Sequence, residues 1–301
     1  MIASIVLNDM DRSQYAAYGF RSWLLQDLTE EYEVILNLFN DKKAHFEALA
    51  EGANPFCRVR IISHEPPRFF NISAANNLGL HYARGKYVLF ANSDIVHQGS
   101  YLRSVMTELE RRALSYVMGT RVNLNALQTS RLLNPLGYTR TNAFTDLIGM
   151  EHEPGRTLVG YLSPWTALRA AAIDIGGFDS AVTCHEDADF NARMAHYLCR
   201  TGRQGFLYAI TDLYGYHLDH PPSELYDASA RSKALLEPRR ARLAKDQDST
   251  ADVVPTDLQS LPALLHEMYN TPLPAPSFRG VARKHPAIRK LRRVWQVLRE
   301  P

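Results

Sequence analysis

Short apolar runs alternate with amphipathic stretches over the first ninety residues of the chain. The runs predict four buried β-strands, at residues 2–7, 33–39, 59–62 and 86–91. The stretches between them space their apolar residues as helices do, at residues 13–28, around 46–50 and at 73–83. Strands that alternate with helices are typical of a parallel sheet with helices on both faces, so we predict an α/β fold.

Polar residues follow three of the four predicted strands directly. They are Asn8-Asp9, Asn40-Asp41 and Asn92-Ser93-Asp94. Ligands of open α/β sheets bind beyond the carboxyl ends of the strands, which favours a binding site at this edge. The alternative is that these residues only form turns, for which Asn and Asp are well suited.

The second half of the chain has a less regular pattern. Residues 120–160 predict long loops and short helices, and residues 167–175 lead into Gly176-Gly177-Phe178-Asp179. A helix is expected from His185-Glu186-Asp187 to about residue 200, with Gly202 as its stop, followed by a strand at 205–210. We therefore predict one large domain, residues 1–228, and a helical C-terminal extension, residues 229–301.

The last segment of the chain, residues 278–301, is strongly basic. Its apolar residues follow a helical spacing of seven, three, four and three: Val281, Ile288, Leu291, Trp295 and Leu298. A basic amphipathic helix with Trp in its apolar stripe suits an anionic membrane surface. Docking of the same helix on its own domain is the alternative.

Composition narrows the class of protein. Hydrophobic residues make up 46% of the 301 residues and charged residues 22%, which allows a sizeable core. The net charge of +2 argues against a nucleic-acid binder. The three cysteines have no metal-site spacing, and neither a signal peptide nor a long apolar span is evident, so we expect a cytoplasmic protein, at most peripheral on a membrane.

Three groups of residues carry candidate chemistry. Asp94, beside Asn92 and Ser93, can hold Mg²⁺ or Mn²⁺ against a diphosphate. Glu186 and Asp187 either stabilise the start of a helix or supply a carboxylate that takes a proton from a hydroxyl. His217 or His220 can complete a metal site, although either histidine can equally be structural.

Taken in order, these residues resemble the inverting family 2 glycosyltransferases, which have the GT-A fold. The resemblance covers roughly residues 2–220. Its strongest block is Asn71, then Ala75-Asn76-Asn77-Leu78-Gly79, then Ala83-Arg84-Gly85-Lys86-Tyr87 and an apolar strand that ends in Asn92-Ser93-Asp94. Gly177-Phe178-Asp179, with Glu186-Asp187 and Arg193, resembles a second block of the family.

The resemblance implies roles for individual residues. Asn8 and Asp41 match positions that contact the base and ribose of a nucleoside diphosphate sugar, and Asn77 matches an asparagine beneath the diphosphate. Asn92 and Ser93 join this donor-binding group. Asp94 and His217 match the metal ligands, with His220 as the alternative to His217. Asp187 matches the catalytic base, with Glu186 as its neighbour near the acceptor.

The acceptor implied is a saccharide or a lipid-linked glycan, and the indole of Trp165 can stack on a sugar ring or simply pack in the core. One departure from the family is Asn92, which replaces its first aspartate and weakens the case for metal binding. Two other functions stay open. One is an inactive module that binds a glycan or partner. The other is a nucleotidyltransferase, against which the acidic turn after the first strand argues, because that class favours a glycine-rich, basic loop there.

Overall fold

The structure is a computed structural model. It describes residues 1–10, 12–112, 116–132, 157–159, 164–202, 208–220, 235–239, 241–243, 253–254 and 256–270, with the backbone alone at 157–159 and 208–212. The basic segment 278–301 and the predicted membrane contact lie outside these residues.

The first half alternates strands and helices as the apolar pattern predicts. Its strands are β1 (Ala3–Asp9), β2 (Tyr32–Leu38), β3 (Cys57–Ser63) and β4 (Tyr87–Phe90). The helices between them are α1 (Ser13–Leu24), α2 (Lys43–Ala50) and α3 (Ile72–Tyr82). Strands β1 and β2 are buried at every position, which explains their unbroken apolar character.

The later strands complete one mixed sheet, and the later helices pack around it. In chain order, these later elements are β5 (Ile95–His97), α4 (Tyr101–Arg111), β6 (Tyr116–Asn123), α5 (Ala126–Leu132), β7 (Thr157–Val159), β8 (Trp165–Leu168), α6 (Arg169–Asp174), α7 (Glu186–Arg200), β9 (Tyr208–His217) and α9 (Leu261–Asn270). The strand order is β3-β2-β1-β4-β8-β6-β9-β5, with β7 paired to β6. The sheet is parallel from β3 to β4, and β8 then runs antiparallel to both of its neighbours.

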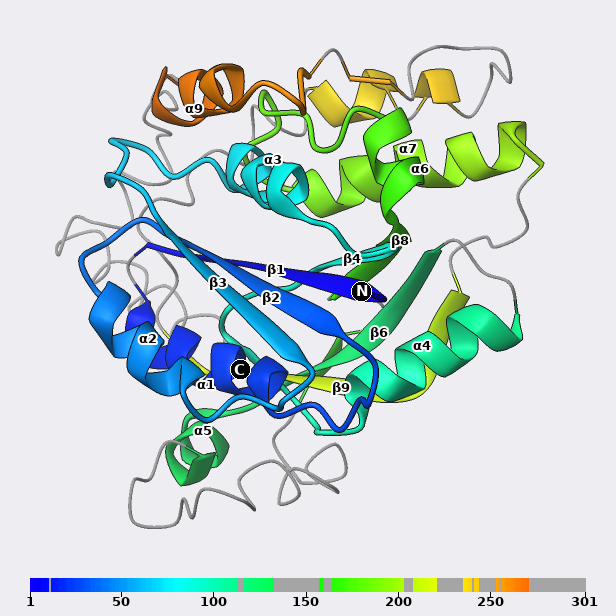
Figure 1. The fold of residues 1–301 in the computed structure, drawn as a ribbon. Helices are drawn as coiled ribbons and strands as arrows, with labels where there is room; N and C mark the ends of the chain where they lie inside the picture. The colour runs from blue at the N-terminus through cyan, green and yellow to red at the C-terminus, as the bar shows by residue number, and fades with distance from the viewer. Residues whose placement is uncertain are drawn as a thin grey trace, which may run out of the picture.

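Helices cover the two faces of the sheet in separate layers (Figure 1). Helices α3, α6, α7 and α9 lie on one face, and α1, α2 and α4 lie on the other. Each layer encloses its own apolar core: Phe90, Phe178 and Phe190 pack together in the first, while Phe20 and Phe46 pack edge to face in the second. The predicted α/β class, a mostly parallel sheet flanked by helices, is confirmed.

The prediction of loops and short helices at residues 120–160 was wrong for its first residues. Residues 120–123 belong to β6, which lies inside the sheet between β8 and β9. Gly119, Thr120 and Arg121 give this strand little apolar periodicity, so its identity depends on backbone pairing with both neighbours. Residues 157–159 likewise form a strand, β7, whereas the short helix α5 is of the kind that the sequence predicts there.

The described part of the C-terminal extension packs on the main domain. Leu264 and Met268 of α9 are buried in the core of the α3 face. Val254 N donates a hydrogen bond of 3.0 Å to Ile175 O, and His81 Nδ1 lies 2.8 Å from Leu258 O. These contacts place α9 against α3, behind the loop that leads to Glu186.

Candidate functional site

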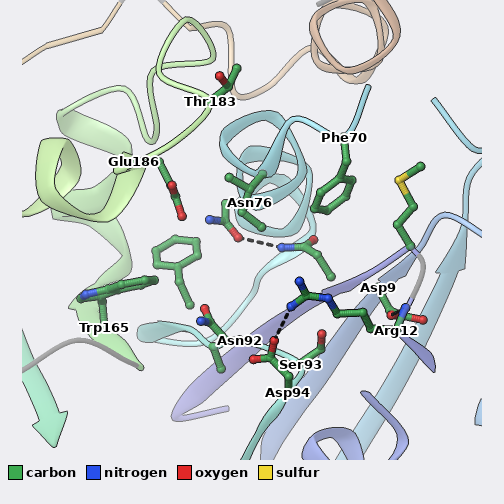
Figure 2. A pocket seen from close by; sticks show the side chains of 15 residues that line it. Asp9, Arg12, Phe70, Asn76, Asn92, Ser93, Asp94, Trp165, Thr183 and Glu186 are labelled. Atoms are coloured by element: carbon green, nitrogen blue, oxygen red, sulfur yellow. Dashed lines mark hydrogen bonds and ion pairs between the residues drawn. The ribbon is translucent and has the colours of Figure 1, made fainter. Parts of the chain in front are cut away.

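A cavity of about 110 Å³ opens at the carboxyl ends of β1 and β4, the edge at which ligands of such sheets bind. Figure 2 shows its lining, which comes from both halves of the chain. The lining residues are Asn8, Asp9, Met10, Arg12, Phe70, Ile72, Asn76, Phe90, Ala91, Asn92, Ser93, Asp94, Trp165, Thr183 and Glu186. Six of the eleven residues for which the sequence suggests a role are therefore in one cavity: Asn8, Asn92, Ser93, Asp94, Trp165 and Glu186.

Asp94 adjoins two histidines from the end of β9. His220 Nε2 lies 2.9 Å from Asp94 Oδ2, and His217 Nε2 lies 3.7 Å from Asp94 Oδ1. One ligand atom from each of the three residues lies within 4.8 Å of the other two. The sequence presents His220 as an alternative to His217, whereas the structure brings both histidines to the same carboxylate.

Hydrogen bonds and one close helix contact hold the backbone around this cluster. Leu218 N donates to Asp94 O at 3.0 Å, and Leu124 N donates to His217 O at 3.0 Å. Asp219 N, between the two histidines, donates to Thr129 Oγ1 at 2.7 Å. Gly19 lets α1 lie against the Asn92–Asp94 turn, because a Cβ at this glycine would come within 2.0 Å of Ser93 O. The backbone of the cluster is therefore held by α1, by Leu124 just after β6 and by the Thr129 side chain of α5.

The electrostatic environment of Asp94 suits a carboxylate that binds a cation. Burial alone would raise the pKa of this carboxyl, but the hydrogen bond with His220 and the charges of His217, His220 and Arg12 outweigh burial and lower it to about 2. Burial also lowers the pKa of His217, against the opposing charge of Asp94. Asp94 Oδ1 is buried and accepts no hydrogen bond from the described residues. An ionised carboxylate with an unused oxygen beside two imidazoles is a suitable donor set for a divalent ion.

Glu186 and Asp187 begin helix α7, on the opposite side of the cavity from Asp94. The residue before them, His185, has a left-handed backbone with φ 63° and makes no side-chain cap. The helix therefore begins without a capping side chain, and Glu186 is the carboxylate that lines the cavity. A non-glycine residue held in this conformation beside a cavity is a feature found at functional sites.

The two carboxylates have different environments. Glu186 is 8% exposed, and burial together with the charge of Asp187 raises its pKa to about 8. Asp187 is half-buried, and its Oδ1 accepts a hydrogen bond from Ala188 N at 2.7 Å. Its charge also contributes to the raised pKa of Tyr116. At neutral pH Glu186 therefore keeps its proton. Asp187 does not itself line the cavity.

The loop that leads to Glu186 is held by polar residues of α3. Asn71 Nδ2 donates to Ser180 O at 2.8 Å, and Ser73 Oγ donates to Val182 O at 2.6 Å. Asn77 Nδ2 donates to Phe178 O at 2.7 Å, while Asn77 Oδ1 accepts from Phe178 N at 2.8 Å. Asn77 is fully buried in these contacts and is not part of the cavity wall, so the geometry assigns it to fixing the loop.

Arg193 of α7 fixes the same loop from its other side. This guanidinium is fully buried and lies 2.8 Å from Asp189 Oδ2. It donates to Ile175 O at 2.9 Å and to Gly177 O at 2.7 Å. Gly177, with φ +67°, lies so close to Asn77 that a Cβ would come within 2.4 Å of Asn77 Oδ1. Asn77 of α3 and Arg193 of α7 thus both hold the backbone of the loop that contains Gly177 and Phe178.

A chain of amides ends in the cavity at Asn76. Asn37 Nδ2 donates to Asn8 Oδ1 at 2.9 Å, and Asn8 Nδ2 donates to Asn76 Oδ1 at 2.7 Å. These bonds fix which way the amides of Asn8 and Asn76 face, and the nitrogen of Asn76 is left toward the cavity (Figure 2). The wall here therefore offers N–H donors to a ligand.

Asp41 lies away from this site. Its side chain is 85% exposed and pairs with Lys42 at 3.1 Å, and it does not line the cavity. The polar contact between β1 and the segment after β2 is made instead by Asn40, which donates to Asp9 Oδ2 at 2.9 Å. This geometry does not support a role for Asp41 in binding the nucleoside diphosphate sugar.

Sequence reasoning missed Arg12 and Asn76, which line the cavity. Asn76 precedes Asn77, and one residue turns the side chain by about 100° around a helix, so the motif alone does not say which amide faces the ligand. From the sequence, Arg12 is only a basic residue shortly after β1, which ends at Asp9. Its orientation depends on how α1 begins, where Asp9 Oδ1 accepts from Arg12 N at 3.2 Å.

The model of glycosyl transferase family 2 matches residues 10–160. The chain belongs to glycosyl transferase family 2. Its fold is the GT-A fold of solved structures of TarS from S. aureus. The TarS fragment 1-349 with UDP has a TM-score of 0.53 and 17% identity, over 81% of this chain and 69% of that one. The same fragment with UDP-GlcNAc has a TM-score of 0.53 and 15% identity, over 76% of this chain and 61% of that one.

Two further findings set the extent of these likenesses. The chain spans 60% of TarS 1-349 in a third structure of that fragment and 37% of the longer TarS structure. A mannosyltransferase from Pyrobaculum calidifontis, in complex with GDP-Man and Mn²⁺, covers 96% of the chain at 13% identity, but its TM-score of 0.49 is too low to support a conclusion. No curated protein matches the sequence. Within the described residues, no helix is both long and apolar enough to cross a bilayer.

Proposed function

We propose that this family 2 protein is an inverting glycosyltransferase. It moves a sugar from a nucleoside diphosphate sugar to a hydroxyl of a saccharide or a lipid-linked acceptor, in the assembly of a surface polysaccharide or glycolipid. One observation carries the proposal: Asp94, with two histidines beside it, and Glu186, beside Asp187, line opposite sides of one cavity at the ligand edge of the sheet.

The donor side of the cavity is formed by Asn8, Asn76, Asn92 and Ser93. Their amides and hydroxyl offer hydrogen-bond partners to a ribose or a sugar, and Asn92 brings no negative charge toward a diphosphate. Asp94, His217 and His220 would hold the divalent ion, Mn²⁺ or Mg²⁺. Such an ion neutralises the charge that develops on the departing nucleoside diphosphate.

The acceptor side lies around Glu186, Asp187 and Trp165. Asp187 takes the proton from the acceptor hydroxyl as its oxygen attacks the anomeric carbon and the bond from that carbon to the diphosphate breaks. Protonated Glu186 adds no second charge and can donate a hydrogen bond to a sugar hydroxyl. Trp165, which is 4% exposed, contributes to the cavity wall, where an indole can pack against a sugar ring.

Donor binding tests the proposal. Nucleoside diphosphate sugars are screened by thermal shift with and without Mn²⁺, for wild type and Asp94→Asn. A donor at a hundred times its Kd stabilises the fold by about 2.7 kcal/mol, which corresponds to a rise in Tm of several degrees. We expect a Mn²⁺-dependent rise for at least one donor in wild type and none in the variant. No rise for any donor under either condition would reject the proposal.

Two alternatives differ in what they predict. An inactive module would bind a donor or glycan, and Asp187→Asn would change no rate, because no turnover exists. A nucleotidyltransferase would release pyrophosphate from a nucleoside triphosphate. Incubating the protein with each substrate class and separating the products distinguishes these from sugar transfer.

Association with the cytoplasmic face of a membrane through residues 278–301 is the second part of the proposal, and it rests on the basic amphipathic pattern of that segment. Sedimentation with vesicles tests it. We expect binding to vesicles that contain anionic lipid, loss of binding when Arg289, Lys290, Arg292 and Arg293 are replaced by Gln, and weakening by salt. Equal binding of both proteins would contradict it.

A further inference from the structure

Arg12 occupies a special place in the metal-ligand cluster. Its Nη1 atom lies 2.9 Å from Asp94 Oδ2 and 3.1 Å from His220 Nε2, and these two atoms lie 2.9 Å from one another. The guanidinium thus contacts two of the three candidate ligands, through a carboxylate oxygen and an imidazole nitrogen that can also bind an ion. Its side chain is 21% exposed and forms part of the cavity wall (Figure 2).

Hydrogen-bonding geometry shows how Nη1 holds these two atoms together. Nη1 donates to the Asp94 carboxylate, and His220 Nε2 lies within hydrogen-bond distance of both Nη1 and Asp94 Oδ2. Oδ2 and Nε2 are thus held side by side at one cationic group. Two ligand atoms that bind one ion at about 2.1 Å and at right angles lie about 3 Å apart, which is close to the spacing observed.

Charge prevents both cations from using these atoms together. An arginine side chain cannot lose its proton in a protein, so its charge is permanent. Asp94 is the only carboxylate among the three candidate ligands Asp94, His217 and His220. One negative charge stabilises either Arg12 or a divalent ion at this position, and the two would repel each other if both remained.

We propose that Arg12 and a divalent cation are alternative occupants of the position between Asp94 and His220. Arg12 is a positioning residue: it keeps the carboxylate and the imidazole in place when no ion is bound, and the ion displaces it on binding. The displaced guanidinium stays at the cavity wall and binds the diphosphate of the donor. This second step rests on the proposed function, and the first does not.

Mn²⁺ binding without nucleotide tests the first step. Free Mn²⁺ is followed by electron paramagnetic resonance during titration of wild type, Arg12→Gln, Arg12→Lys, Asp94→Asn and the control Arg58→Gln, whose arginine pairs with Glu31 on the surface. We expect Arg12→Gln to bind Mn²⁺ about tenfold more tightly than wild type, Arg12→Lys to lie between them, Arg58→Gln to equal wild type, and Asp94→Asn to lose binding. Equal or weaker binding by Arg12→Gln, or no binding by wild type and Arg12→Gln alike, would overturn the exchange.

Thermal unfolding shows that the variants are folded and adds an independent readout. In EDTA, Arg12→Gln should have a lower Tm than wild type, because Asp94 has lost its cationic partner. Mn²⁺ should raise the Tm of Arg12→Gln by more than it raises that of wild type. Equal responses of the two proteins to Mn²⁺ would contradict the exchange.

Inorganic pyrophosphate tests the second step, in the presence of saturating Mn²⁺. We expect Arg12→Gln to bind pyrophosphate at least tenfold more weakly than wild type, which is opposite in direction to its effect on Mn²⁺. Unchanged pyrophosphate affinity would overturn the second step. If wild type exchanges Arg12 for Mn²⁺ but binds no nucleoside diphosphate sugar, the proposed function fails and the exchange stands.

Discussion

Asn77 uses both polar atoms of its side chain to hold the backbone of Phe178, a residue 101 positions later in the chain. Nδ2 donates to the carbonyl and Oδ1 accepts from the N–H of the same residue. The amide thereby pairs with the loop backbone as a neighbouring strand would. It connects helix α3 to the segment that leads to Glu186 and Asp187.

Replacing Asn77 should therefore affect stability first, whereas replacing its neighbour Asn76 should affect the ligand. Asn77→Ala leaves the N–H and C=O of Phe178 buried without partners, which costs about 2–4 kcal/mol in free energy of unfolding. Asn76→Ala removes one hydrogen bond at the cavity wall and should cost about 1 kcal/mol or less. Urea unfolding measures both. Donor affinity, measured on folded protein, should fall more for Asn76→Ala, and the reverse ranking would contradict the assignment.

Thr129 positions the two histidines through the N–H of Asp219. Thr129→Val removes the acceptor and keeps the shape, while Thr129→Ser keeps the hydroxyl. Because partners that orient metal ligands affect metal affinity by about 10–100-fold, Thr129→Val should weaken Mn²⁺ binding about tenfold or more, and Thr129→Ser should restore most of it. Calorimetric titration with Mn²⁺ measures this. Valine and serine variants with the same affinity would remove the role given to this hydroxyl.

Glu186 should set an upper pH limit for activity. Burial and the charge of Asp187 raise its pKa to about 8, so it carries a proton at neutral pH and loses it as the pH rises. The ionised form brings a second charge next to Asp187, and we expect kcat/KM of wild type to fall above about pH 8. Glu186→Gln imitates the protonated form and should lack this fall while retaining activity at pH 7. An identical alkaline limb in both proteins would refute this reading.

His97 should make the fold sensitive to acid. It is fully buried against Trp23 and Tyr101, and neither ring nitrogen has a hydrogen-bond partner among the described residues. Burial lowers its pKa to about 3, so the unfolded chain takes up a proton below about pH 6.5 that the folded chain does not. The stability that a neutral His97 provides is present above pH 6.5 and is lost as the pH falls toward 3.

The loss amounts to about 2 kcal/mol between pH 6.5 and pH 5. His97→Leu has no such proton to bind and should lose that much less over this range. The exposed His45 supplies the control, since His45→Gln should lose as much stability as wild type. Urea unfolding at both pH values measures the difference, and a His97→Leu variant as acid-sensitive as wild type would contradict the explanation.

The parts of the fold that sequence patterns predict are those that local periodicity determines. Strands β1 and β2 are unbroken apolar runs because both faces are covered, and the helices between them repeat their apolar residues every three or four positions. Strand β6 has no such signal, because Gly119, Thr120 and Arg121 interrupt it and its hydrogen bonds go to strands distant in sequence. The antiparallel direction of β8 likewise comes from tertiary pairing.

A similar limit applies to the candidate site. Asp94, His217 and His220 stand out as candidates by residue type and by their places near strand ends, and Glu186 and Asp187 by their place at the start of a helix. The orientation of a side chain was not predictable, so Asn77 was assigned to the donor while its neighbour Asn76 faces the cavity. Arg12 was overlooked for the same reason, since its contact with Asp94 spans 82 positions and follows from how α1 crosses the end of β4.

The central claim is that Asp94 binds the donor in the cavity through a divalent ion, and that Asp187, next to Glu186 of the cavity wall, takes the proton from the acceptor. The most direct measurement compares donor binding and sugar release or transfer for wild type, Asp94→Asn and Asp187→Asn in the presence of Mn²⁺, with the donor found by thermal shift. The account predicts that Asp94→Asn loses Mn²⁺-dependent donor binding, whereas Asp187→Asn still binds the donor and loses transfer by a factor of about 10² or more. An Asp187→Asn enzyme that transfers sugar at the wild-type rate would contradict it.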